Sequence, residues 1–138
     1  MVPVNRTTAT GRELVLSVGS RFDRCTWSVA LAAGLGSAGL AICRTYSRPE
    51  TLGRVEQGGL AGAIVVSDRE PQEGLSLLRG IRSISGDLPC WFVAREATRR
   101  TLESALTLQV SSVLIQPVNV SAFTWTLLRT LCDLDQPY

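Results

Sequence analysis

Short β-rich segments alternate five times with segments that have a helical apolar face, and this order restricts the fold more than any other feature of the chain. An almost wholly apolar segment such as Ala61–Val66 is typical of a strand covered on both faces. Right-handed crossovers between five β–α units give a parallel sheet with helices on both sides. We therefore predict an α/β fold of the (βα)5 type, a three-layer sandwich with a parallel five-stranded sheet of order 2-1-3-4-5. The predicted strands are Glu13–Val18, Leu40–Cys43, Ala61–Val66, Leu88–Val93 and Val113–Ile115.

A predicted helix follows each of these strands. The first begins near Ser20, whose hydroxyl can cap free backbone N–H groups. The second begins with Ser47-Arg-Pro-Glu50, a capping box with proline in the first turn. The last is capped by Asn119 or Ser121. The apolar residues expected on the buried faces are Phe22, Cys25, Val29 and Ala33; Leu52 and Val55; Leu75, Leu78 and Ile81; Leu102, Ala105 and Leu106; and Phe123, Leu127 and Leu131.

The 138 residues are enough for one hydrophobic core and not for two. We predict a flexible polar segment over residues 1–11, a single domain over 12–133 and a short tail over 134–138. A net charge of +2 and scattered arginines argue against nucleic-acid binding. No apolar run approaches the roughly 18–20 residues of a membrane span, and the first residues do not resemble a signal peptide. We therefore expect a cytoplasmic protein that binds neither membranes nor nucleic acid.

The chain has no histidine, which removes the commonest general base and the commonest metal ligand. Its four cysteines, Cys25, Cys43, Cys90 and Cys132, form no CxxC pair and stand in apolar segments. We therefore expect them to be buried, reduced thiols. This composition predicts a protein that is not an enzyme and holds neither a metal nor a cofactor.

Four motifs resemble the receiver domain of response regulators. Ala63–Pro71 is an aliphatic strand followed by an acidic, proline-containing loop, and Gly74–Arg82 has the form G-L-x-L-L-x-x-I-R. Leu88-Pro89 opens the next strand, and Ala105–Pro117 ends in Gln-Pro. The resemblance is weaker before Leu40. It implies a flavodoxin-like receiver fold and a role in two-component signal transduction, with a kinase, a regulator or a second copy of the chain as the protein partner.

The resemblance also identifies which residues correspond to the phosphorylation pocket of a receiver. In that family an acidic pair after strand 1 helps to hold Mg²⁺, and an aspartate after strand 3 accepts the phosphoryl group. A hydroxyl after strand 4 and a lysine after strand 5 contact that group. The corresponding positions here are Val18-Gly19, then Ser67 or Asp68 depending on one loop gap, then Ala94, and finally Gln116-Pro117, where the family implies a cis bond.

These departures imply a stand-alone pseudo-receiver that acts by phosphorylation-independent protein–protein interaction. By family analogy, its partner surface lies around the fourth helix, the fifth strand and the fifth helix. We also expect Trp125 to face outward, because it is out of phase with the apolar stripe of its helix. The residues predicted for this surface are Arg99, Arg100, Glu103, Thr107, Trp125 and Arg129.

Two alternatives remain open from the sequence. Asp68 could accept a phosphoryl group, as in a regulator that is still phosphorylated. Gly34–Gly39 matches G-x-G-x-x-G, which would bind a dinucleotide or another small ligand if Val29–Ala33 were a strand and Leu40–Tyr46 a helix.

Overall fold

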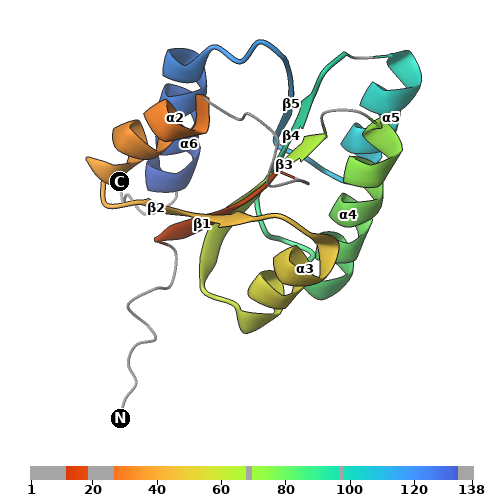
Figure 1. Cartoon of the computed structure of the whole chain (residues 1–138), viewed down its shortest axis with the longest axis horizontal. Helices are drawn as coiled ribbons and strands as arrows, with labels where there is room; N and C mark the ends of the chain where they lie inside the picture. The colour runs from red at the N-terminus through yellow and green to blue at the C-terminus, as the bar shows by residue number, and fades with distance from the viewer. Residues whose placement is uncertain (1–11, 19–26, 68–69, 97, 134–138) are drawn as a thin grey trace.

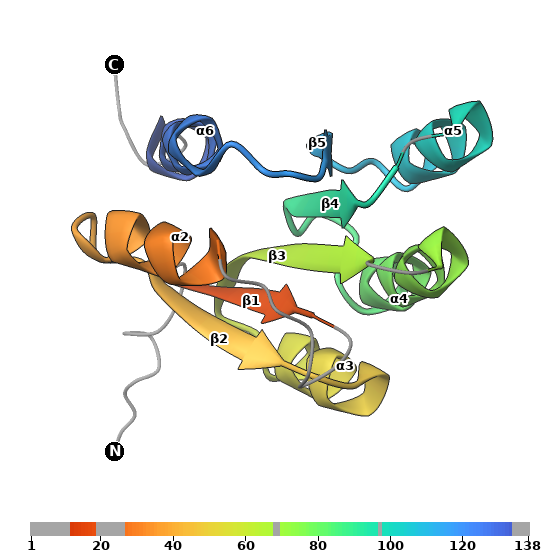
Figure 2. The same cartoon turned by 45° about the horizontal axis from the view of Figure 1, so that its top comes forward.

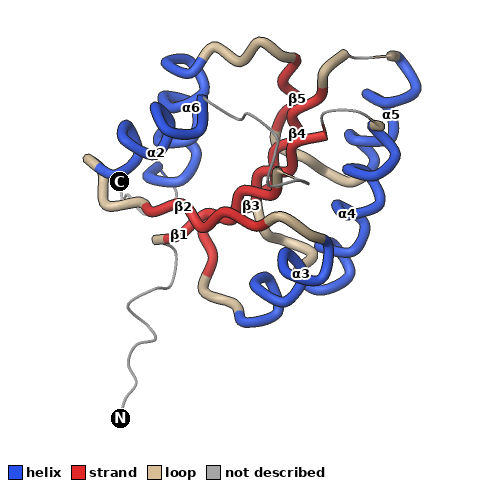
Figure 3. Tube along the Cα trace, in the orientation of Figure 1, coloured by secondary structure: helices blue, strands red, loops and turns tan. Residues whose placement is uncertain are grey.

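The computed structural model describes residues 12–18, 27–67, 70–96 and 98–133. Its five strands form one parallel sheet in the order β2-β1-β3-β4-β5, which confirms the predicted topology (Figure 3). The strand bounds differ from the predicted ones by one or two residues at most of the ends. The strands are β1 (Glu13–Ser17), β2 (Ala41–Thr45), β3 (Leu60–Ser67), β4 (Cys90–Ala94) and β5 (Ser112–Ile115).

Helices cover both faces of this sheet, so the predicted three-layer sandwich is also confirmed. Figures 1 and 2 show α2 and α6 side by side on one face, and α3, α4 and α5 on the other. None of the helices in the described ranges is long and apolar enough to cross a membrane. The helices are α2 (Trp27–Gly36), α3 (Arg48–Gln57), α4 (Pro71–Ile84), α5 (Arg99–Thr107) and α6 (Val120–Asp133).

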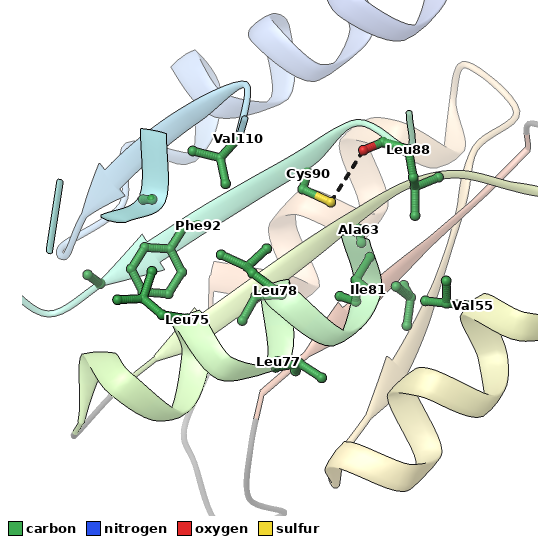
Figure 4. Packing of buried hydrophobic residues seen from close by; sticks show 14 residues of the cluster. Val55, Ala63, Leu75, Leu77, Leu78, Ile81, Leu88, Cys90, Phe92 and Val110 are labelled. Carbon is green, nitrogen blue, oxygen red and sulfur yellow. Dashed lines mark hydrogen bonds between the residues drawn. The ribbon is translucent and has the colours of Figure 1, made fainter. Parts of the chain in front are cut away.

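Two apolar cores lie on the two sides of the sheet because successive strand residues point to opposite faces. In β1, Val15 points to the core under α3, α4 and α5, whereas Leu14 and Leu16 point to the core under α2 and α6. In β4, Phe92 and Trp91 divide in the same way, and both are fully buried. Figure 4 shows the first of these cores, in which α4 packs its leucines against β3 and β4.

Two of the three predicted helix caps are present, and the third, Ser20, lies outside the described residues. Ser47 Oγ accepts a hydrogen bond from the Glu50 amide at 3.2 Å, and the Glu50 carboxylate accepts one from the Tyr46 amide at 2.8 Å. At the start of α6, Asn119 Oδ1 accepts from the Ala122 amide at 3.1 Å, so Asn119 is the cap rather than Ser121. These contacts satisfy backbone donors that have no partner within the first turn of a helix.

The predicted buried face of α2 is wrong. Val29 is 65% exposed and Ala33 is also exposed, whereas α2 buries Ser28, Leu31 and Leu35. Almost every side of this helix is apolar, so spacing alone could not select the buried side, and the longer leucines reach the sheet. Phe22 and Cys25 lie outside the described residues.

Two other helices bury a threonine where we predicted a leucine. In α3 Thr51 is fully buried and Leu52 only partly, and in α5 Thr101 is buried whereas Leu106 is 62% exposed. Each threonine lies in the first turn of its helix and has a hydrogen-bonded hydroxyl, as Thr51 shows by donating to the Ser47 carbonyl at 2.9 Å. A local hydrogen bond of this kind removes the usual cost of burying a hydroxyl.

Candidate functional site

The described residues of the predicted pocket gather at one edge of the sheet, where the parallel strands end. Ser67 pairs with Ala94, and Ala94 pairs with Ile115, the residue before Gln116. The backbone N–H of Gln116 donates to the Ala94 carbonyl at 2.9 Å. Val18 follows the last residue of β1, the strand beside β3. The described pocket positions therefore lie at the same edge of the sheet.

At the end of β3, Ser67 is the residue in register with Ala94. It is buried, and its hydroxyl donates to the Glu70 carbonyl at 2.6 Å. Gly74 of α4 presses against it, since a Cβ on Gly74 would lie 2.8 Å from the Ser67 Cβ. The Ser67 hydroxyl therefore ties the loop after β3 to the strand. The alternative acceptor, Asp68, lies outside the described residues, so the choice between the two stays open.

After β1, an apolar side chain occupies the first of the two positions that the resemblance assigns to an acidic pair. Val18 is 3% exposed and belongs to the apolar core beneath α2 and α6, together with Leu16, Val66 and Val93. Its amide donates to the Thr45 carbonyl at 3.1 Å, which fixes the residue beside β2. Gly19, the second position of the pair, lies outside the described residues. The described position thus offers a methyl surface rather than a metal ligand.

The residues at the end of β4 and just after β5 lack the hydroxyl and the cation of a receiver. Ala94 is fully buried and has no side-chain donor. Gln116 is half-buried and carries a neutral amide. The peptide bond between Gln116 and Pro117 is cis, as the resemblance implied. Across the described part of the chain, no group of three or more His, Cys, Asp or Glu side chains could hold a metal ion.

Sequence reasoning missed a buried cluster of hydroxyls beside this edge. Thr45 Oγ1 and Thr51 Oγ1 are 2.7 Å apart, and Thr51 Oγ1 lies 3.3 Å from Ser17 Oγ. All three side chains are at most 2% exposed. They come from β2, α3 and β1, and they join these elements by polar contacts inside an apolar setting. The signal in the sequence was a hydroxyl at or next to the end of each of two apolar strands.

Arg82 is a second feature that sequence reasoning missed. Its guanidinium donates to the carbonyls of Leu108 at 2.8 Å, Leu88 at 2.6 Å, Gln109 at 3.1 Å and Ser85 at 3.3 Å. A planar group with five donors suits several acceptors at once. Arg82 therefore links the end of α4 to the loops before β4 and β5.

The two cysteines that the structure describes in full have free thiols. Cys90 is buried as predicted, and its Sγ donates to the Leu88 carbonyl at 3.4 Å. Burial raises the pKa of the Cys90 thiol to about 11, with a smaller opposing effect of Arg82. Cys43 is only partly buried, so the prediction of burial is too strong there; burial and then the charge of Glu13 raise its pKa. Cys25 and the side chain of Cys132 lie outside the described part.

The six residues predicted for a partner surface form two groups on different helices. On α5, Arg99 forms an ion pair with Glu103 at 3.1 Å, and the Thr107 hydroxyl donates to the Glu103 carbonyl at 2.9 Å. On α6, Trp125 is 61% exposed, which confirms that it faces outward, and the Arg129 guanidinium lies 5.1 Å from its ring centroid. Figure 1 shows α5 and α6 on opposite faces of the sheet. The remaining member, Arg100, is exposed on α5.

The Gly34–Gly39 motif does not have the geometry of a dinucleotide site. It runs from the last turn of α2 into the turn before β2, whereas such a site needs a strand first and a helix second. Gly34 has a packing role instead, because a Cβ there would lie 2.9 Å from the Thr124 Cγ2 of α6. Gly39 has a φ of +82°, which a glycine adopts without strain. The strand over Val29–Ala33 and the helix over Leu40–Tyr46 that this alternative required are therefore wrong.

No family model matches the sequence, and no curated protein matches it. Solved structures match the fold over most of the chain. A CheY-like response regulator receiver domain from Methanospirillum hungatei is 15% identical with a TM-score of 0.73, over 90% of this chain and 96% of the other. An orphan response regulator of H. pylori is 14% identical with a TM-score of 0.72, over 88% of this chain and 98% of the other. A response regulator from Burkholderia pseudomallei with a phosphorylated aspartic acid, calcium ion and citrate is 18% identical with a TM-score of 0.67, over 90% of this chain and 71% of the other.

At these identities the comparisons establish the fold. The chain has the flavodoxin-like fold of response-regulator receiver domains, as the sequence motifs indicated.

Proposed function

We propose that this chain is a receiver-type signalling domain that binds protein partners and does not use phosphorylation of an aspartate. The observation that carries the proposal is the strand-end edge of the sheet. There Val18, Ala94 and Gln116 stand where a receiver has a metal-binding acid, a hydroxyl and a lysine. The fold of a signalling domain is kept, and three groups that its chemistry needs are replaced.

Electrostatics supports this proposal. A phosphoryl group brings about 1.5 to 2 negative charges at neutral pH, and a protein stabilises it with cations and directed donors. The buried methyl groups of Val18 and Ala94 supply neither, and the amide of Gln116 supplies a dipole without a charge. A phosphoryl group at this edge would therefore lie against apolar side chains with little compensation.

The end of β3 also supports it. If Ser67 is the acceptor position, its hydroxyl is already donated to the Glu70 carbonyl at 2.6 Å. A serine needs a base to become a nucleophile, and the chain lacks histidine, the commonest general base. The proposed role includes neither catalysis nor a bound metal or cofactor.

Binding then depends on the outer surface of the domain. The α5 group, with Arg99, Arg100, Glu103 and Thr107 all exposed, is a polar surface suited to a kinase or a regulator in the cytoplasm. The choice of this face rests on analogy with receivers.

The test uses beryllofluoride, a mimic of the phosphoryl group, with Mg²⁺ and the ¹⁵N-labelled full chain. We expect no saturable chemical-shift change at the amides of Ser67, Ala94 or Gln116, because the site lacks the groups that bind the mimic. A receiver that is known to be phosphorylated provides the positive control, and Mg²⁺ alone provides the baseline.

Saturable shifts at those amides, together with shifts in α5, would overturn the proposal and favour a regulator that is phosphorylated on Asp68. Mass spectrometry after incubation with a small-molecule phosphoryl donor provides an independent measurement. A stable acyl phosphate on the intact chain would contradict the proposal in the same way.

A further inference from the structure

We propose that the outer face of α2 and α6 is a homodimer interface, in which two copies of the chain pack these faces together about a two-fold axis. This proposal does not depend on whether the strand-end site is inert. It concerns the outer α2–α6 face, which is a set of exposed residues on the two helices of one layer. The residues are Val29, Ala30, Ala33, Ala122, Trp125 and Arg129.

The composition of α2 is the first observation. The ten residues of Trp27–Gly36 include no charged side chain, and serine is the only polar one. A helix that is apolar on every side is normally buried on every side. Here the sheet covers only one side, and Val29 on another is 65% exposed. Leaving this side in water exposes apolar surface that a partner could bury.

The two helical layers differ sharply in charge. Helix α6 contains Arg129 and Asp133 as its only charged residues, and the Arg129 guanidinium stacks on the Trp125 ring at 5.1 Å. The layer on the other face is charged throughout. Its charged residues are Arg48, Glu50, Arg54 and Glu56 in α3, Glu73, Arg79 and Arg82 in α4, and Arg99, Arg100 and Glu103 in α5.

The two helices form one continuous surface. Their inner sides pack on the sheet through residues such as Leu31 and Leu127, both fully buried. Between the helices, Gly34 allows Thr124 to approach so closely that a Cβ would lie 2.9 Å from its methyl group. Figure 2 shows α2 and α6 directly beside each other along the sheet. The outward-pointing residues of both helices therefore belong to the same face.

This face fits a second copy of itself. It carries one large projection, Trp125, and three alanines, which leave room for a projecting side chain. A two-fold axis places each projection against the alanines of the other copy, since an isologous interface pairs one patch with itself. A partner recognised by charge would bury its charges against a face whose one charged member, Arg129, already stacks on Trp125. Among the helices in the described ranges, α2 alone has no charged residue. In a two-fold dimer the α2–α6 face of the second copy brings the same uncharged helix to the interface.

The test is sedimentation velocity of the full chain from micromolar to millimolar concentration. We expect a monomer–dimer equilibrium, which Val29→Arg weakens at least about a hundredfold, because the arginine would be buried at the centre of the interface. Leu106→Arg on α5 is the matched control, since Leu106 is 62% exposed and Val29 65%. We expect that variant to dimerise like the original chain.

Ala33→Glu is a second interface variant, in case Val29→Arg does not fold, and circular dichroism checks the fold of each. A chain that stays monomeric at millimolar concentration overturns the proposal. So does a dimer that survives both interface variants, or one that only Leu106→Arg disrupts, since either result places the interface on another face.

Discussion

Replacing Gly34 by alanine should reveal how closely α2 and α6 are packed. An added Cβ would lie 2.9 Å from the Thr124 Cγ2, nearer than non-bonded carbon atoms normally approach. Thr124 is β-branched and stands in a helix, so only two χ1 rotamers are open to it. Either this side chain changes rotamer or one of the two helices moves.

Two opposing effects set the magnitude. Alanine is better than glycine in a helix by about 1 kcal/mol, and overpacking in a close contact costs about 1–3 kcal/mol. Gly34→Ala should therefore lower the free energy of unfolding by about 1 kcal/mol, within a range of roughly 0–2. In a domain of this size, that corresponds to a fall of roughly 3–5 °C in Tm.

A double-mutant cycle with Thr124→Ser separates the two effects. Serine removes the methyl group that the new Cβ would meet, so Gly34→Ala should become stabilising by up to about 1 kcal/mol in that background. Urea unfolding of the four proteins gives the coupling energy, which we expect to be about 1–3 kcal/mol. Gly53→Ala in α3 is the control, since its Cβ would meet nothing within 4 Å.

A change of sign between the two backgrounds is the critical result. If Gly34→Ala stabilised the original chain as much as Gly53→Ala does, there would be no close contact between α2 and α6. The same would follow if Gly34→Ala changed the free energy of unfolding by the same amount with threonine and with serine at position 124.

Two further predictions concern buried groups. Burial raises the pKa of Cys90 from its ordinary value of 9.0 to about 11, so the folded state keeps the proton between about pH 9 and 11 whereas the unfolded state loses it. The contribution of this thiol to the free energy of unfolding is fully present below pH 9 and is lost as the pH rises, by about 2–3 kcal/mol in total. Between pH 8 and 10.5, urea unfolding should therefore show a larger loss of stability in the original chain than in Cys90→Val. Equal losses in the two proteins would refute this prediction. Arg82→Met should lower the free energy of unfolding by about 2–4 kcal/mol, because four carbonyls lose their donor. The control, Arg79→Met on the exposed side of α4, should change it by less than about 0.5 kcal/mol. Similar effects of the two substitutions would show that the carbonyl contacts contribute little.

The sheet and the pocket register were predictable because strands in a parallel sheet share one direction and end at one edge. The motifs put Ala94 at the end of the fourth strand, and in the structure Ala94 is the last residue of β4, paired with Ser67 and Ile115. Strand bounds were less accurate, since Leu40 and Leu88 are buried just before their strands begin.

The orientation of α2 could not be predicted for a physical reason. Amphipathic periodicity needs polar residues on one side, and α2 has almost none. By contrast, α6 has three threonines and one serine outside an apolar stripe of Phe123, Leu127 and Leu131, and all three residues of this stripe are buried as predicted. The same polar spacing correctly placed Trp125 outside.

The hydroxyl cluster was beyond the reach of the sequence because its members come from different elements. Ser17 and Thr51 are 34 residues apart, and only the pairing of β1 with β2 brings their hydroxyls together with Thr45. Arg82 was equally hidden, since the carbonyls that it contacts lie 3 to 27 positions away along the chain. Local patterns do not encode such distances.

Under the proposed function, the loss of phosphorylation chemistry is built into the packing of the core. Val18 is 3% exposed among Leu16, Val66 and Val93, so a carboxylate at that position would have to ionise in apolar surroundings. Its pKa would rise, and a protonated acid is a poor ligand for Mg²⁺. Ala94 is likewise fully buried, and an added hydroxyl there would need both space and a partner. Restoring the missing side chains one at a time would therefore cost stability before it restored any chemistry, which favours a domain whose function resides on its outer surface.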